Sequence, residues 1–146
     1  MPAGPVPYPH RIRFEDPARH GIVLGHERDY TDLTNWVHVV APAPAARCVD
    51  QIATALVSNA HRHTRSGDPG GTVRVAIHVD AFLLTLRVTD NGPRAGDTIP
   101  YPRLGEQRPS PVSGLYLVDQ LTVYWDWEWR GTTMGPLTAR AVVENP

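Results

Sequence analysis

The chain of 146 residues contains no lysine, because all 14 of its basic residues are arginine. This absence excludes Walker-type P-loop nucleotide hydrolases, protein kinases that need a strand lysine, and enzymes that form a Schiff base. The acidic residues number 15, so the formal net charge is −1, and no basic stripe indicates a nucleic acid or a membrane surface. We therefore expect neither of these as a direct partner.

Cysteine and long apolar runs are also scarce. Cys48 is the only cysteine, which excludes an internal disulfide and favours a reducing compartment. No apolar run approaches the roughly 20 residues that a membrane span needs, and residues 1–13 lack the apolar core of a signal peptide. We expect a cytoplasmic protein with a loose, proline-rich arm over residues 1–18 and one folded domain over residues 19–146.

The spacing of apolar residues predicts both helices and strands. A three-to-four-residue repeat is typical of helices, and strict alternation is typical of strands. We predict a strand at 21–26, helices at 29–40 and 45–63, strands at 72–79 and 82–90, a helix at 115–121, and strands at 121–129 and 137–143. Antiparallel neighbours with helices on one face make an α+β fold, a two-layer α/β sandwich with a mainly antiparallel, mixed sheet.

Three polar features interrupt this pattern. Asn59 borders the apolar stripe of the long helix, where a side chain either faces a cleft or is solvated. Asp90 ends the inward-facing row of its strand, so it needs a hydrogen-bond partner from its own turn or from a ligand. Gly114 opens a helix after a long loop over 91–113, and N–H groups at a helix start can hold a phosphate.

These features occur in segments that together resemble the GHKL superfamily of histidine-kinase-like ATP-binding domains. The resemblance is greatest to the stand-alone anti-sigma-factor kinases, whose N-box has the usual form E-L-V-x-N-A-x-x-H. It covers about residues 45–143 and implies the Bergerat fold of that superfamily. The segments that carry it are Ala55-Leu56-Val57-Ser58-Asn59-Ala60-His61-Arg62-His63-Thr64 (N-box), Asp90-Asn91-Gly92 (D-x-G), Gly114-Leu115-x-Leu117-Val118 (second glycine box) and Gly135-Pro136-Leu137-Thr138 (G-x-x-T).

The resemblance implies a role for four residues around the base and the metal. Asn59 would hold Mg²⁺, which bridges the phosphates of ATP. Asp90 would accept a hydrogen bond from the adenine amino group, and Thr138 would support it through a water molecule. Gly92 would let the chain pass close to the base. The implied cofactors are therefore ATP and Mg²⁺.

The resemblance also implies where the phosphates lie. Gly114 and Leu115 would open the helix that receives them, and residues of about 93–113 would form the ATP lid. Arg62 and His63, at the end of the N-box, are candidates for contacts with the phosphates. Each of these assignments concerns binding rather than catalysis.

The chain departs from the family where catalysis is concerned. The family's general base is a glutamate four residues before the N-box asparagine, and this position is Ala55. Loss of a general base typically lowers a rate by about 10²–10⁴-fold. We therefore assign no catalytic residue and expect an ATP-binding regulatory protein with weak or absent catalysis. The resemblance implies a sigma factor or a STAS-domain anti-anti-sigma factor as partner, and a homodimer is left open.

Two alternatives remain at this point. The protein is an active serine/threonine kinase of a STAS-domain partner if another carboxylate, such as Glu106 or Asp97 in the lid, replaces the missing base. It is a nucleotide-free protein-binding module if ATP binding has been lost as well. Phosphate transfer distinguishes the first alternative, and nucleotide binding distinguishes the second.

The remaining aromatic and histidine side chains have simpler interpretations. Trp125, Trp127 and Trp129 share one face of a strand, which favours core packing over an interaction patch. His61 and His63 lie two residues apart on a helix, a spacing that does not converge on one metal ion.

Overall fold

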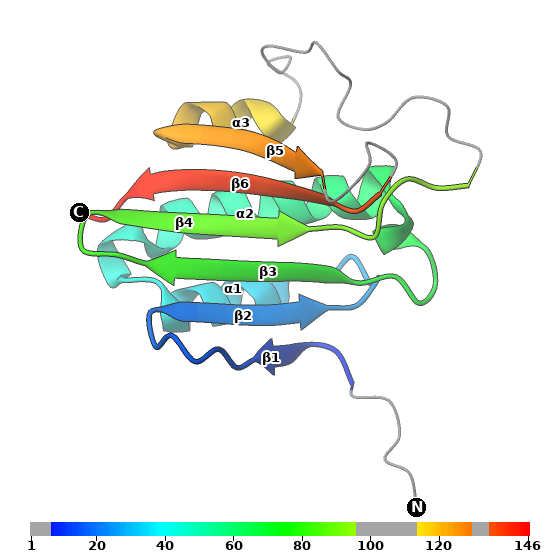
Figure 1. The fold of residues 1–146 in the computed structure, drawn as a ribbon, viewed down its shortest axis with the longest axis horizontal. Coiled ribbons are helices and arrows are strands. Elements are labelled where there is room, and N and C mark those ends of the chain that lie inside the picture. The colour runs from blue at the N-terminus through cyan, green and yellow to red at the C-terminus, as the bar shows by residue number, and fades with distance from the viewer. Residues whose placement is uncertain (1–6, 96–113, 130–134) are drawn as a thin grey trace, which may run out of the picture.

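A computed structural model of the chain describes residues 7–95, 114–129 and 135–146. These residues form one sheet with helices on one of its faces (Figure 1). The strand order is β1-β2-β3-β4-β6-β5, and each of its five pairings is antiparallel. The predicted two-layer α+β fold with a mainly antiparallel sheet is thus confirmed. The elements are β1 (His10–Ile12), β2 (Arg19–Leu24), α1 (Thr31–Val40), α2 (Ala43–His63), the short 3₁₀ helix η1 (Arg65–Gly67), β3 (Val73–Val79), β4 (Leu83–Thr89), α3 (Gly114–Leu121), β5 (Tyr124–Trp129) and β6 (Leu137–Glu144).

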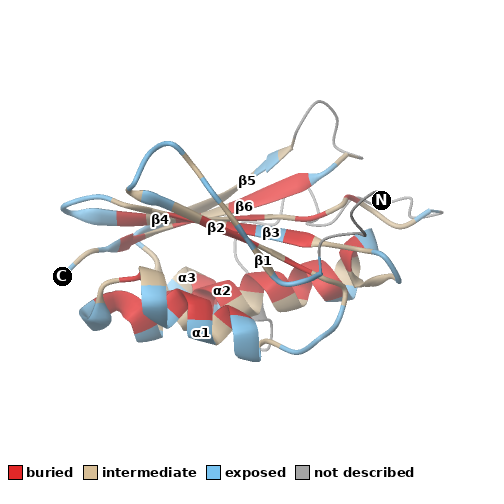
Figure 2. Ribbon diagram, turned by 90° about the horizontal axis from the view of Figure 1, so that it is seen from below, coloured by how far each residue is buried: buried red, intermediate tan, exposed pale blue. Residues whose placement is uncertain are grey.

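Helix α2 positions the candidate site because it packs along the centre of the sheet. A proline in its first turn suits the helix start, where no hydrogen-bonding N–H is needed. Its apolar stripe is fully or nearly fully buried against the sheet, as Figure 2 shows by colour. The hydroxyl of Thr64 donates to the carbonyl of Ala60 at 2.6 Å and accepts from the amide of Ser66 at 3.1 Å, and the helix ends there.

The strands divide their side chains between the two faces of the sheet. Val75 and Ile77 of β3 and Leu84 and Leu86 of β4 are buried beneath the helices. The alternate residues of these strands lie on the other face, which none of the three described helices covers (Figure 2). The sheet therefore presents a buried inner face and a solvent-facing outer face.

The structure differs from the sequence prediction at the N-terminus. Residues His10–Ile12 form β1, which pairs with Gly21–Val23 of β2, where we expected a loose arm. Most of the expected lid, residues 96–113, lies outside the described residues. No helix in the described part of the chain is long and apolar enough to cross a membrane.

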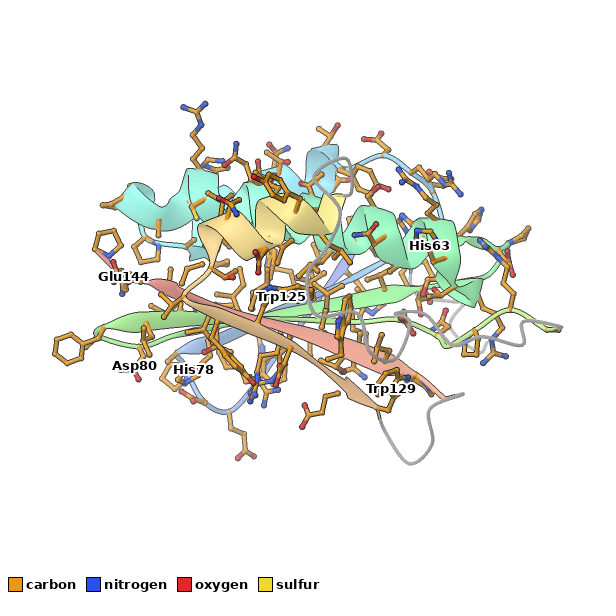
Figure 3. All side chains as sticks on the ribbon, turned by 90° about the horizontal axis from the view of Figure 1, so that it is seen from above. His63, His78, Asp80, Trp125, Trp129 and Glu144 are labelled. Carbon is orange, nitrogen blue, oxygen red and sulfur yellow. The ribbon has the colours of Figure 1, made fainter. Side chains whose placement is uncertain are left out.

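The tryptophans of β5 do not all have the same environment. Trp125 and Trp127 pack against the core, with ring centroids 5.4 Å apart at 79°, which agrees with the core interpretation. Trp129, at the end of the strand, instead borders a hollow on the outer face. Figure 3 shows Trp125 between the sheet and the helices, and Trp129 at the end of its strand.

Candidate functional site

Asn59 projects from α2 toward the inner face of the sheet and is only 6% exposed. Its amide nitrogen Nδ2 is fully buried and has no hydrogen-bond partner among the described residues. Buried polar groups are nearly always paired, and an unpaired one costs about 1–3 kcal/mol. This nitrogen is therefore a donor that lacks an acceptor, as expected where a ligand binds.

Asp90 lines the same hollow as Asn59, from the end of β4. It is 7% exposed, and its Oδ1 accepts hydrogen bonds from the amides of Gly92 at 2.7 Å and Leu137 at 3.1 Å. Burial raises the pKa of the Asp90 carboxyl above its ordinary value, although these two hydrogen bonds and the charge of Arg65 act in the opposite direction. The structure thus brings Asn59 and Asp90 together, as the sequence predicted.

Gly92 occupies a backbone conformation that only glycine adopts easily, with φ of +92°. A Cβ atom at this position would lie 3.2 Å from the carbonyl carbon of Gly135. The chain therefore makes a close approach here to the backbone of Gly135 and Pro136, and the expected approach to a nucleotide base stays a prediction. The carbonyl of Gly92 also accepts a hydrogen bond from the amide of Arg65 at 2.9 Å, which ties this turn to the end of α2.

The hollow between Asn59 and Asp90 is small. Its volume is about 10 Å³, and Trp127 and Leu137 are among the residues that line it. This is room for about one water molecule. The polar groups fit an adenine or a phosphate in chemical type, but a base would enter only after side chains that line the hollow, such as Trp127, moved aside.

Thr138 is not part of this hollow. Its hydroxyl lies 2.8 Å from the hydroxyl of Thr89, its partner across the β4–β6 pairing. Both residues line the hollow on the outer face. Because side chains alternate along a strand, Leu137 faces the inner site and Thr138 faces away from it. The structure therefore does not support the expected contact of Thr138 with the Asp90 carboxylate.

The C-terminal end of α2 gathers positive charge. Arg62 is exposed there, and His63, labelled in Figure 3, is half-buried on the helix. Burial lowers the pKa of His63, as do the nearby charges of Arg62 and Arg94. Arg94 donates to the carbonyls of Arg62 at 2.8 Å and His61 at 3.2 Å, and it pairs with Asp68 at 3.1 Å. Sequence reasoning missed Arg94, whose role depends on contacts across 32 residues.

The helix expected to receive phosphate begins at Gly114, as predicted. Leu115 is buried in the core rather than exposed toward a ligand. The Sγ atom of Cys48 in α2 lies 3.8 Å from the carbonyl oxygen of Leu121, at the other end of α3. The residues before Gly114 lie outside the described residues, so the phosphate contact stays a prediction.

Sequence reasoning also missed the role of His61. Its Nε2 lies 3.0 Å from the carbonyl of Gly25, so this nitrogen carries the proton, and Nδ1 accepts from the hydroxyl of Tyr30 at 3.1 Å. The two rings stack, and burial is the main cause that lowers the pKa of His61. The signal for its burial was its spacing of four and eight residues from Val57 and Ala53 in the apolar stripe.

The chain matches no family model and no curated protein. Within the described residues, no group of three or more histidine, cysteine, aspartate or glutamate side chains could hold a metal ion. The chemistry assigned to the site therefore rests on its own residues.

Proposed function

We propose that the protein binds ATP with Mg²⁺ at the inner hollow and acts as a regulatory module through contacts with another protein. The observation that carries this proposal is the unpaired Nδ2 of Asn59, which lies in the same hollow as the buried carboxylate of Asp90. A buried donor and a buried acceptor on facing elements recognise a ligand that presents both types of group.

Each of these residues would contact a different part of the nucleotide. The amide of Asn59 would hold Mg²⁺ or a phosphate oxygen, since an amide offers both an acceptor and a donor. The two N–H groups that bind Oδ1 of Asp90 fix the orientation of its carboxylate, which would accept a hydrogen bond from the adenine amino group. The metal ion, when bound, would neutralise phosphate charge.

Weak or absent catalysis follows from the position one helical turn before Asn59. Ala55 is half-buried there and packs against the core. Alanine neither accepts a proton nor orients a nucleophile, so the described site offers no general base at this position. Regulation by a bound nucleotide requires no such group.

A protein partner is proposed from the resemblance to anti-sigma-factor kinases, with a sigma factor or a STAS-domain anti-anti-sigma factor as the class. Several large apolar side chains remain exposed on α3 and on the neighbouring edge of the sheet, and they offer a contact surface. They are Tyr116, Leu117, Val123 and Tyr124. Large exposed apolar side chains are common at protein interfaces.

One observation favours the second candidate, a nucleotide-free binding module. The hollow holds about 10 Å³ with Trp127 in its wall, which is far too small for a base. If Trp127 does not move, ATP has no place at this site.

The third candidate is an active kinase. It depends on Glu106 or Asp97, which lie outside the described residues. Transfer of labelled phosphate to a STAS-domain partner tests it.

Calorimetric titration with Mg²⁺-ATP separates the first two candidates. We expect a dissociation constant below about 1 mM, a change in tryptophan fluorescence as Trp127 moves, and at least about tenfold weaker binding in Asn59→Ala and Asp90→Asn. Asn35→Ala and Asp80→Asn, which alter exposed residues, should bind like the unmodified protein. Absence of binding by the unmodified protein at millimolar ATP would overturn the nucleotide proposal.

A further inference from the structure

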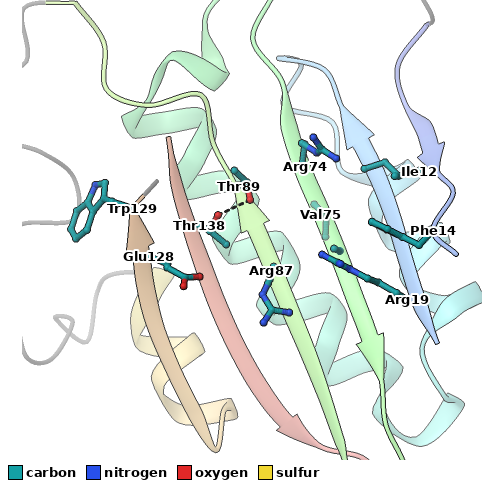
Figure 4. Close-up of a pocket in the computed structure, with 11 residues that line it drawn as sticks. Ile12, Phe14, Arg19, Arg74, Val75, Arg87, Thr89, Glu128, Trp129 and Thr138 are labelled. Carbon is teal, nitrogen blue, oxygen red and sulfur yellow. Dashed lines mark hydrogen bonds between the residues drawn. The ribbon is translucent and has the colours of Figure 1, made fainter. Parts of the chain in front are cut away.

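The outer face of the sheet carries a second, larger hollow. Its volume is about 390 Å³, within the range of about 300–1,000 Å³ typical of small-molecule sites. Arginines 19, 74 and 87 project into it from three neighbouring strands, β2, β3 and β4 (Figure 4). It lies on the face opposite to Asn59 and Asp90, so it is separate from the proposed nucleotide site.

The strand register explains why a hollow forms here. One row across the outer face runs from Gly21 through Ala76 to Arg87, so two small residues stand beside a long one. The ring of Phe14 covers the position of Gly21, where a Cβ atom would lie 2.8 Å from it. Ala76 therefore forms part of the floor of the hollow, and the ring of Phe14, which covers Gly21, forms a wall.

The neighbouring row provides hydrogen-bonding groups. It runs from Arg74 through Thr89 to Thr138, and the two threonine hydroxyls lie 2.8 Å apart. Each hydroxyl both donates and accepts, so the pair can bind to one another and still contact a ligand. Glu128 follows Thr138 in this row, on the edge strand β5.

The charge of this hollow is positive. Arg140, one strand further from Arg87, is neutralised by Asp126, with two hydrogen bonds of 2.7 and 3.0 Å. Among the described residues, none of the three arginines that line the hollow makes an ion pair with an acidic side chain, and Arg19 lies over the Phe14 ring at 4.4 Å. Three guanidinium groups thus face the hollow, and Glu128 is the one carboxylate among the described residues that line it.

We infer that this hollow is a binding site for a small polyanion, a molecule with phosphate or carboxylate groups, held by Arg74 and Arg87 with the Thr89–Thr138 hydroxyl pair. Guanidinium groups match the geometry of both oxyanions and bind them with two parallel hydrogen bonds. Arg19, positioned by Phe14, adds a third positive charge at the rim. The volume of about 390 Å³ limits the ligand to a small molecule, and Phe14 and Trp129 stand at opposite ends of the hollow (Figure 4).

Titration of the ¹⁵N-labelled protein with pyrophosphate at low ionic strength tests this inference. We expect saturable shifts of the amide signals of Ala76, Thr89 and Thr138, which sodium chloride at equal ionic strength does not reproduce. A parallel titration with succinate distinguishes phosphate from carboxylate ligands. The anion that binds more tightly indicates which of these two classes the ligand belongs to. Failure of both anions to produce saturable shifts at these residues would overturn the inference.

Variants locate the site and control for general electrostatics. The double substitution Arg74→Gln with Arg87→Gln should weaken pyrophosphate binding at least about tenfold. Arg47→Gln removes an exposed arginine from the helical layer and should leave binding unchanged. Equal weakening by Arg47→Gln, or shifts centred on Asn59 and Asp90, would assign the effect to net charge or to the inner site and refute the outer one.

Discussion

Asp90 and Leu137 are joined by two hydrogen bonds in opposite directions. The Asp90 amide donates to the carbonyl of Leu137 at 3.0 Å, and the Leu137 amide donates to the Asp90 carboxylate at 3.1 Å. The carboxylate thus replaces the backbone carbonyl that would continue the β4–β6 ladder. This exchange holds a charged group at the inner face, where the candidate ligand site lies.

The first prediction concerns the pH dependence of stability through Asp90. Burial raises its folded-state pKa above the ordinary 3.8, so folding favours the protonated form. This contribution to stability is full below about pH 4 and is lost as the pH rises through the folded-state pKa. Asp90→Asn resembles the protonated state, so its stability relative to the unmodified protein should increase as the pH rises above 4.

Urea unfolding between acidic and neutral pH measures this difference. The lowered pKa values of His61 and His63 produce the opposite trend, a loss of stability as the pH falls, but both proteins share it, and it cancels. Asp80→Asn, at an exposed turn, is the control for removal of a carboxylate. A difference between Asp90→Asn and the unmodified protein that stays constant with pH would contradict the prediction.

The second prediction separates backbone strain from steric conflict at Gly92. Gly92 and Gly70 both have positive φ, but a Cβ atom at Gly70 meets nothing within 4 Å, whereas one at Gly92 meets the Gly135 carbonyl. Gly70→Ala should therefore cost only the conformational penalty of about 1 kcal/mol. Gly92→Ala should cost roughly 2 kcal/mol or more, measured by thermal and urea unfolding. Equal losses in the two variants would show that the close approach to Gly135 is unimportant.

The third prediction concerns the buried contact between Tyr30 and His61. Tyr30→Phe removes the hydroxyl that donates to Nδ1 of His61 and leaves this nitrogen without its donor. The free energy of unfolding should fall by about 1–3 kcal/mol. Tyr116→Phe, at an exposed position of α3, is the matched control and should change it by less than about 0.5 kcal/mol. If Tyr116→Phe lowered the free energy of unfolding as much as Tyr30→Phe, the prediction for the Tyr30–His61 contact would be contradicted.

The fourth prediction restores a carboxylate at the position of the family's base. Ala55→Glu places it one helical turn before Asn59, and it should raise ATP hydrolysis or phosphoryl transfer if the rest of the site is competent. Gln51→Glu adds the same charge one turn earlier on an exposed position and should have no effect. An unchanged rate in a folded, ATP-binding Ala55→Glu protein would show that more than the base is missing.

Local patterns in the sequence were sufficient to predict much of the fold and part of the candidate site. Alternation placed Asp90 on the inward row, and helical spacing placed Asn59 at the border of the buried stripe, and the structure brings them together. For Thr138 the two kinds of signal differ, because alternation along β6 places it on the face opposite to Leu137, whereas the resemblance to the family implies a role beside Asp90.

Other features of the structure could not be predicted from local sequence patterns. Strand β1 lies in a proline-rich segment, and its pairing with β2 depends on an edge that only the folded sheet provides. Arg94 reaches the end of α2 across 32 residues, and the outer hollow depends on the register of four strands. Such relations arise from tertiary packing, so residue spacing alone does not reveal them.

The step from Leu137 to Thr138 has a consequence for how this chain tolerates insertions. These two consecutive residues belong to opposite faces of the sheet. The amide of Leu137 donates to the Asp90 carboxylate, and the hydroxyl of Thr138 is hydrogen-bonded to that of Thr89. One extra residue between Leu137 and Thr138 would turn Thr138 and the side chains after it to the other face and would alter both hollows at once. Natural variants of this chain should therefore change residue types in β6 more readily than its length.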